Sequence, residues 1–229
     1  MYKVKNPIKQ YCILSISIII LCLFENTLLA APVECFAVSD LVRVFEDGYN
    51  CPKLQASIDV FGVRNEYVSA QCVVKANQDL QNVTISLSSL KHTSHSTSIP
   101  ADAIQWNFVG SIPIEQNTPK YRKTDLIRTA PAQFPDYLAE DRQVSVKRGS
   151  YKAVYLTIKI PESAEAGEYE GKVTVKTDEA DVSLPLHLKV YPLTLPDERH
   201  LMVTEWYTTG NFRKFYGIES SDSQRFTIC

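Results

Sequence analysis

The sequence predicts an all-β fold, a two-sheet antiparallel β-sandwich of the immunoglobulin-like or jelly-roll-like kind. Three observations lead to this prediction. Apolar and polar residues alternate with a period of two in many segments, polar turn-rich stretches separate those segments, and helical periodicity is nearly absent before Leu201. Because successive side chains of a strand point to opposite faces, each segment carries one apolar row, and a second sheet is needed to cover these rows.

The expected strands follow one another along the chain at residues 36–45, 55–61, 66–74, 82–87, 104–108, 152–160, 169–175 and 182–190. Pro185 lies on the polar side of the last strand, so that strand is expected to be at a sheet edge or to carry a bulge there. Gly171 lies on the apolar side of a Val-rich strand, which predicts the close approach of a neighbouring strand. The side chains expected to be buried are Val154, Leu156, Ile158, Val173, Val175, Leu186 and Leu188.

Two stretches between the strands are expected to be irregular. Residues 89–100 are rich in Ser, Thr and His and are expected to form a surface loop. Residues 115–140 have weak periodicity and contain Pro119, Pro131 and Pro135. Loops longer than ~12–15 residues are uncommon and are usually functional or disordered, so this second stretch is of interest for binding.

The chain changes character after its last strand. Pro192 and Pro196 bracket a linker, because neither residue can continue a central strand. A strand-like run at residues 201–207 and a helix-compatible stretch at residues 211–217 then form a βα pattern. One βα unit cannot bury its own strand, whereas a TIM-type barrel supplies eight strands, so we expect an orphan βα fragment of such a barrel.

The N-terminus has the pattern of a signal peptide, assigned to residues 1–30. Three lysines precede residues 12–24, which are almost wholly apolar. This core is shorter than the ~20 residues of a spanning helix and fits the ~7–15 of a signal peptide. We expect cleavage after Ala30 and an exported protein, periplasmic or extracellular, with no membrane span. A lipoprotein anchor is less favoured, because neither Cys22 nor Cys35 follows the small residue that a lipobox requires.

Three domains are expected from these boundaries. Residues 1–30 form the signal peptide, residues 31–195 form the β-sandwich, and residues 196–229 form a linker and the start of a truncated catalytic barrel. The truncation is inferred because the chain ends at Cys229, where the βα pattern has only begun.

Charge and cysteine usage limit the classes of partner. The formal net charge is −2, which gives no electrostatic footprint for nucleic acid. The sequence has no C-x-x-C spacing, so neither a zinc site nor a thioredoxin-like site is supported. Cys72 is expected in the core, because it shares one side of its strand with Val68 and Val74. The disulfide pairing is left open among the cysteines that follow Ala30, which are Cys35, Cys51, Cys72 and Cys229.

Motifs of catalysis and cofactor binding are missing from the sequence. It has no G-x-S-x-G elbow for a serine nucleophile and no glycine-rich phosphate loop, and no cofactor is expected. His92 and His95 are the one close histidine pair. In a loop without a third neighbouring ligand, such a pair is expected to be polar surface rather than a zinc site.

The order of motifs near the end of the β-rich region is distinctive. FPDYL (residues 134–138) is followed by a strand, by PESAEAGEYEG (residues 161–171) and by a second strand. This order resembles the N-terminal sandwich of glycoside hydrolase family 123, in which a WPDPL-like loop, a strand, P-x-x-A-x-x-G-x-Y-x-G and another strand follow in turn. RNEY (residues 64–67) with Gln71 is similar to that family's R-N-E-x-x-x-x-Q strand, and residues 201–217 resemble the start of its barrel.

The resemblance implies a part of an enzyme that hydrolyses N-acetylgalactosaminides with assistance from the substrate. In such enzymes an adjacent Asp-Glu pair deep in the barrel orients the acetamido group and protonates the leaving oxygen, outside the usual two-carboxylate scheme. The Asp-Glu pairs of this chain are residues 178–179, in a predicted hairpin turn, and residues 197–198, in the linker. Neither pair is assigned as catalytic, and the chain alone is expected to be inactive.

The leading interpretation is therefore a non-catalytic N-terminal sandwich module of an exported glycoside hydrolase that acts on N-acetylgalactosamine-containing glycans. The alternative is a stand-alone carbohydrate-binding or cell-envelope interaction module, and a third interpretation is an envelope scaffold without a ligand. No catalytic, cofactor-binding or metal-binding residue is assigned. The candidates for glycan contact are aromatic: Tyr121 and Tyr137 in the long irregular stretch, and Trp206 at the end of the expected barrel strand.

Overall fold

The structure, a computed structural model, describes residues 31–120, 122–198, 200, 202–204 and 217. The chain divides into two units, Met1–Leu195 and Pro196–Cys229, and each is considered by itself. The expected signal peptide and nearly all of the expected βα fragment lie outside the described residues.

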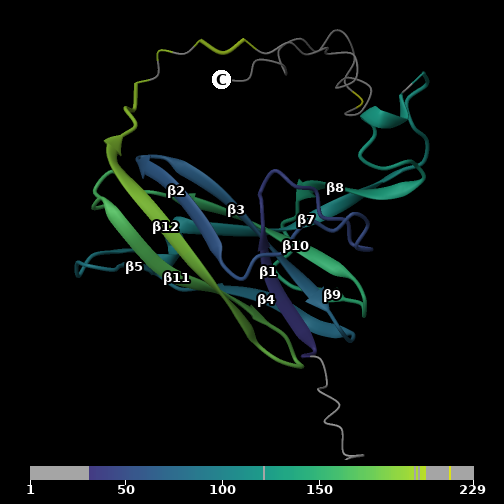
Figure 1. Ribbon diagram of the computed structural model, residues 1–229, viewed down its shortest axis with the longest axis horizontal. Helices are drawn as coiled ribbons and strands as arrows, with labels where there is room; N and C mark the ends of the chain where they lie inside the picture. The colour runs from purple at the N-terminus through teal and green to yellow at the C-terminus, as the bar shows by residue number, and fades with distance from the viewer. Residues whose placement is uncertain (1–30, 121, 199, 201, 205–216, 218–229) are drawn as a thin grey trace, which may run out of the picture. The chain divides into compact units, whose positions relative to one another are not determined.

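The alternating segments form strands that assemble into two sheets, seen as two layers in Figure 1. The first sheet has the order β1 (Val33–Val38), β3 (Tyr67–Ala76), β10 (Tyr151–Lys159), β7 (Ile104–Ile114) and β8 (Ala132–Leu138). The second has the order β2 (Ile58–Arg64), β12 (Val182–Thr194), β11 (Gly167–Lys176), β4 (Leu80–Leu87) and β9 (Val144–Val146), with β5 (Leu90–His92) beside β11 and β6 (Ser98–Ile99) beside β5.

Two short 3-10 helices, η1 (Ala101–Ala103) and η2 (Lys123–Asp125), are the described helical elements. No helix among the described residues is long and apolar enough to cross a membrane.

The apolar rows of both sheets meet in one hydrophobic core. Every side chain that the alternation predicts to be buried there has a relative exposure of 0%, and so has Cys72. Each Val, Leu or Ile removed from water stabilises the fold by ~1.5–3 kcal/mol. The prediction of these buried residues is confirmed: Val154, Leu156, Ile158, Val173, Val175, Leu186 and Leu188.

Pro185 and Gly171 have the surroundings that their positions predict. Pro185 pairs with β11, but the pairing of β12 with β2 starts one residue later, at Leu186, so the strand is locally an edge at the proline. A Cβ atom on Gly171 would lie 2.7 Å from Cδ2 of Leu90 and 3.1 Å from the backbone oxygen of Ser89. The close approach expected at this glycine is confirmed.

The sheets are not purely antiparallel, contrary to the prediction. Strand β2 pairs with β12 in parallel, with Leu186 opposite Ile58 and Val190 opposite Gly62. A tight hairpin makes its two strands antiparallel, but β2 and β12 are joined by most of the domain, so nothing in their connection sets their relative direction.

The surface loop predicted at residues 89–100 is confined to residues 93–97, which are exposed and lie between two strands. These are strands β5 and β6, which pair with each other, and the side chains of Leu90 and Ile99 are buried. The two strands are so short that their few apolar residues give no visible periodicity, and their burial depends on contact with β11.

Residues 115–140 are also more regular than expected. FPDYL lies in β8, which pairs with an extended β7, and the register shifts between Gly110 and Ser111. Pro135 is tolerated because β8 is the last strand of its sheet. The first strand likewise differs from the prediction, since it covers Val33–Val38 rather than residues 36–45.

Arg128 holds the remaining part of this stretch against the loop that follows β1. Its guanidinium group lies 4.9 Å from the ring of Phe45 and 4.6 Å from that of Tyr49, and donates a 2.9 Å hydrogen bond to Asp47. This contact lowers the pKa of Asp47 below its ordinary value. A single cation therefore stacks on two rings and binds a carboxylate, which anchors the long connection.

Candidate functional site

The PESAEAGEYEG motif forms the wall against which strand β5 packs. Strand β11 begins at Gly167, where φ is +146°, and a Cβ atom there would collide with Nε2 of His92. A Cβ atom on Gly171 would likewise collide with Leu90. Both glycines of the motif are therefore explained by packing, because β5 passes too close to β11 for a side chain at either position.

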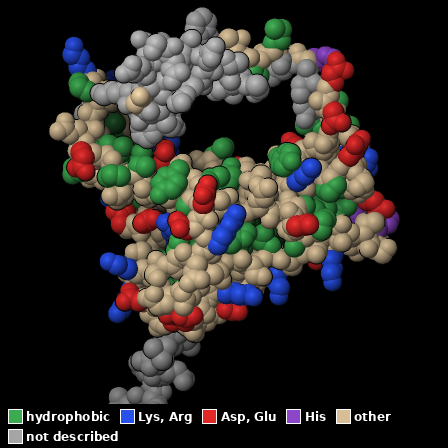
Figure 2. Space-filling model, turned by 180° about the vertical axis from the view of Figure 1, so that it is seen from behind, with side chains coloured by type: hydrophobic (Ala, Val, Ile, Leu, Met, Phe, Trp, Pro, Cys, Tyr) green, Lys and Arg blue, Asp and Glu red, His purple; other side chains and the backbone are tan. Residues whose placement is uncertain are grey.

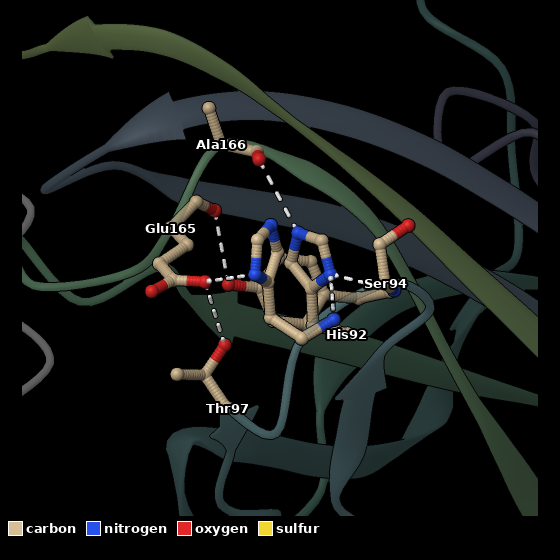
Figure 3. Close-up of polar contacts among 7 residues, drawn as sticks. His92, Ser94, Thr97, Glu165 and Ala166 are labelled. Carbon is tan, nitrogen blue, oxygen red and sulfur yellow. Dashed lines mark hydrogen bonds and ion pairs between the residues drawn. The ribbon is translucent and has the colours of Figure 1, made fainter.

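His92 is the centre of this packing (Figure 3). Its Nε2 lies 3.2 Å from the backbone oxygen of Ala166, and its Nδ1 accepts hydrogen bonds from the amides of Ser94 and His95 at 3.0 and 3.1 Å. The ring packs edge-on against Tyr169 at 4.9 Å. With a relative exposure of 8%, His92 is not the surface residue that the sequence predicts.

A third potential metal ligand lies beside the histidine pair, which the sequence could not show. Nδ1 of His95 is 3.7 Å from Oε2 of Glu165, and one ligand atom each from His92, His95 and Glu165 lie within 4.8 Å of one another. A metal needs a ring nitrogen with a free lone pair. The carbonyl of Ala166 requires a proton on Nε2 of His92, and two amides occupy the lone pair of Nδ1, so this arrangement serves to lock the β5–β6 hairpin.

The RNEY motif holds the end of the domain. Asn65, with φ +61°, makes the turn between β2 and β3, and its side-chain amide donates a 2.9 Å hydrogen bond to the backbone oxygen of Leu195. The amide of Leu195 donates to the backbone oxygen of Arg64 at 2.9 Å. Nε of Arg64 donates at 2.7 Å to the backbone oxygen of Ala164. The motif thus ties the exit of the chain to the loop before β11.

Gln71, the last residue of the RNEY-related pattern, has a similar role at another loop. Its side chain is buried, and Nε2 donates hydrogen bonds of 2.9 and 3.0 Å to the backbone oxygens of Ser39 and Val42. A buried amide with both protons bonded fixes the loop after β1 on the face of the first sheet.

Among the predicted glycan contacts, Tyr137 is the one that the structure describes. Its side chain is 50% exposed, and the ring covers Gly110 of the neighbouring strand β7, where a Cβ atom would collide with it. A hollow of about 360 Å³ beside it is lined by Pro135, Asp136 and Leu138 but not by Tyr137. Tyr121 and Trp206 lie outside the described residues.

A different pair of aromatic side chains is exposed on the outer face of the second sheet. Phe61 of β2 and Tyr191 of β12 have relative exposures of 70% and 41%, and their ring centroids are 6.0 Å apart at an interplanar angle of 82°. They border a hollow of about 230 Å³. Sequence reasoning missed this site, although both residues interrupt the alternation by placing a large ring on the polar side of a strand.

A histidine–carboxylate contact and a lysine–carboxylate ion pair form the rim of this hollow. Nδ1 of His187 lies 2.9 Å from Oδ1 of Asp59, and Nζ of Lys189 lies 3.1 Å from Oε1 of Glu168. The hydroxyl of Ser57 and the ring of His187 lower the pKa of Asp59. Contact with Glu168 raises the pKa of Lys189. Each carboxylate of the rim therefore has a partner. We call this region, lined by Asp59, Phe61, Glu168, His187, Lys189 and Tyr191, the outer hollow.

Acidic and basic side chains are interspersed over the face of the molecule shown in Figure 2. Neither sign gathers into a patch on that face. This distribution agrees with the net charge of −2 and offers no basic stripe for a nucleic acid backbone.

The family model described as Glycoside hydrolase 123 N-terminal domain matches residues 47–177, which is more than half of the chain. The chain belongs to this family. The matched region includes β2 to β11, and so both the β5–β11 packing and the RNEY turn.

A longer protein of known structure contains a similar fold. A family 123 glycoside hydrolase from Clostridium perfringens, described in connection with glycolipid glycan hydrolysis, superposes with a TM-score of 0.66 at 17% identity. The match covers 83% of this chain and 33% of that chain, so this protein spans about a third of the length of that enzyme. A FixG-related protein from Vibrio parahaemolyticus matches with a TM-score of 0.34, 8% identity, and coverage of 69% and 96%. No curated protein matches the chain.

Proposed function

We propose that this chain carries the non-catalytic N-terminal module of an exported glycoside hydrolase that acts on N-acetylgalactosamine-containing glycans. In this proposal residues 1–30 are a signal peptide, residues 31–195 are a β-sandwich of immunoglobulin-like or jelly-roll-like type, and residues 196–229 are a linker and the start of a barrel. Membership of the family carries the proposal.

The anchored exit supports a positioning role for the module. Both backbone polar groups of Leu195 are bonded to the RNEY turn, so the chain leaves the domain at a fixed point. The chain therefore leaves the domain from a residue that is bonded to its surface, which a module that orients a catalytic domain requires.

The contacts of the Asp178-Glu179 pair support a non-catalytic role. Oδ2 of Asp178 accepts a 2.6 Å hydrogen bond from the side chain of Asn82, and the carboxylate of Glu179 lies 3.2 Å from the amide of Gln81. This adjacent pair therefore caps the hairpin between β11 and β12 against β4. Substrate-assisted hydrolysis needs such a pair in an enclosed cleft, and this pair lies at the surface.

The direct test of the proposal is an activity assay on the whole chain without residues 1–30, using an aryl N-acetyl-β-galactosaminide. No turnover above the buffer control is expected. Mass analysis of the protein exported by its native host should show an N-terminus at Ala31. Turnover that survives repurification and is lost on Asp178→Asn or Asp197→Asn would show that the chain is itself an enzyme.

A further inference from the structure

The outer hollow is unlike the rest of the outward surface of the second sheet. An exposed aromatic side chain costs free energy in water, and Phe61 is 70% exposed although it lies in the middle of a regular strand. Its neighbour Tyr191 is on the adjacent strand β12, so the two rings come from segments far apart in the sequence. Two aromatic side chains brought together at one hollow are typical of a binding surface.

The charges of the rim limit what the outer hollow can bind. Asp59 already shares a contact with His187, and Lys189 is already paired with Glu168, so the rim presents no unpaired lysine to a ligand. A phosphate or an acidic peptide would have to break one of these pairs. The paired groups still have hydrogen-bonding capacity, because a carboxylate has about four acceptor sites and an ammonium group has three donors. The rim therefore suits an uncharged ligand that has many hydroxyl groups.

The shape of the outer hollow gives the second restriction. Its volume of about 230 Å³ is below the ~300–1,000 Å³ of enclosed ligand pockets, and it is open to solvent. A ligand would lie on the surface with one side against the rings. A pyranose ring has a face of C–H groups that packs on an aromatic ring and an edge of hydroxyl groups that hydrogen-bonds to a polar rim.

We infer that the outer hollow is a binding site for a neutral sugar residue, which packs on Phe61 and Tyr191 and is hydrogen-bonded by Asp59, Glu168, His187 and Lys189. This inference goes beyond the proposed positioning role, because it gives the module a glycan contact of its own. It also does not depend on a catalytic domain. Failure of the sugar test would leave the positioning role standing, and enzymatic activity of the chain would leave the sugar site standing.

The chain offers a matched control for the aromatic contact. Tyr67 of β3 is 62% exposed, and Nζ of Lys159 lies 5.8 Å from the centre of its ring. Tyr191 has almost the same arrangement, with Nζ of Lys189 at 5.6 Å. Tyr67 is in the other sheet and does not line the outer hollow. Comparing substitutions of the two tyrosines therefore distinguishes binding at the outer hollow from binding to any exposed tyrosine ring.

The experiment is a calorimetric titration of the chain lacking residues 1–30 with a neutral oligosaccharide that ends in N-acetylgalactosamine. Millimolar affinity is expected for a single contact of this size. Phe61→Ala and Tyr191→Ala should each weaken association by roughly tenfold, which corresponds to about 1.4 kcal/mol. Tyr67→Ala should change it by less than about twofold, and thermal melts should show that all three variants are folded.

Three results of the titrations would overturn the inference. They are an absence of binding by the unsubstituted chain, an equal loss in Tyr67→Ala, and stronger binding of a sialylated oligosaccharide than of its neutral counterpart. Light scattering on the same samples tests a second copy of the chain as the occupant. A dimer that Phe61→Ala abolishes would also contradict a sugar site.

Discussion

Two histidines of this domain each lie near a carboxylate, and they differ in the bonds that their ring nitrogens can still form. His92 is buried, and both of its ring nitrogens are bonded to the backbone. His187 lies on the outer face, with Nδ1 beside Asp59 and much of the ring exposed. The PESAEAGEYEG motif is recognisable in the sequence, and the histidine that packs against it, His92, has a structural role. The exposed His187, which is accessible to a ligand, lies in a strand without a recognisable motif.

The largest effect is expected from a substitution that disrupts the packing of β5 against β11. Gly171→Val places a side chain where Leu90 and the backbone of Ser89 already lie. Overpacking of this kind costs ~1–3 kcal/mol, and each kcal/mol lowers the Tm of a domain of this size by roughly 2–4 °C. Calorimetry should therefore show a Tm several degrees lower. Glu170→Val introduces the same side chain at an exposed position of the same strand and should leave the Tm almost unchanged.

A second substitution compares the two histidines directly. His92→Ala removes the partner of three backbone groups, those of Ala166, Ser94 and His95. A buried polar group left without a partner costs ~1–3 kcal/mol, so urea unfolding should show a clear loss of stability. His187→Ala, on the exposed face, should cost less than about 1 kcal/mol. Equal losses in the two variants would contradict the distinction between a structural and an available histidine.

Much of this could be predicted from the sequence, and the failures have physical causes. Period-two alternation identified the buried rows because burial on one face of a strand is a local property. The partners of His92 could not be predicted, since Ala166 is 74 residues away and joins it through the pairing of β5 with β11. The parallel pairing of β2 with β12 is long-range in the same way. Phe61 and Tyr191 depart from the alternation of their strands, which the sequence shows. That the two rings lie close together depends on the pairing of β2 with β12, which the sequence does not show.

A third prediction concerns the anchored exit. Asn65→Ala loses the hydrogen bond to Leu195 and disfavours the positive φ at this turn, whereas Asn65→Gly loses the bond and keeps the turn. Limited proteolysis should cut after the domain faster in both variants than in the parent chain, and fastest in Asn65→Ala. Unchanged cleavage in both would mean that the RNEY turn does not hold the exit.

The smallest expected effect is a pH dependence at the outer hollow. The hydroxyl of Ser57 and the ring of His187 lower the pKa of Asp59 in the folded protein. A lowered folded pKa contributes stability above the unfolded value of ~3.9, and this contribution is lost as the pH falls through the folded pKa. Asp59→Asn should therefore destabilise slightly at pH 7, by less than about 1 kcal/mol for so exposed a group, and the difference should vanish in strong acid.

The central claim is that the packed motif supports the fold while the outer hollow contacts a glycan. The most direct test is an NMR titration of the histidine ring signals with the neutral N-acetylgalactosamine-terminated oligosaccharide. The account predicts that the signals of His187 shift in proportion to bound sugar while those of His92 and His95 stay in place. Shifts at His92 and His95, with His187 unaffected, would contradict it and place the glycan contact at the motif.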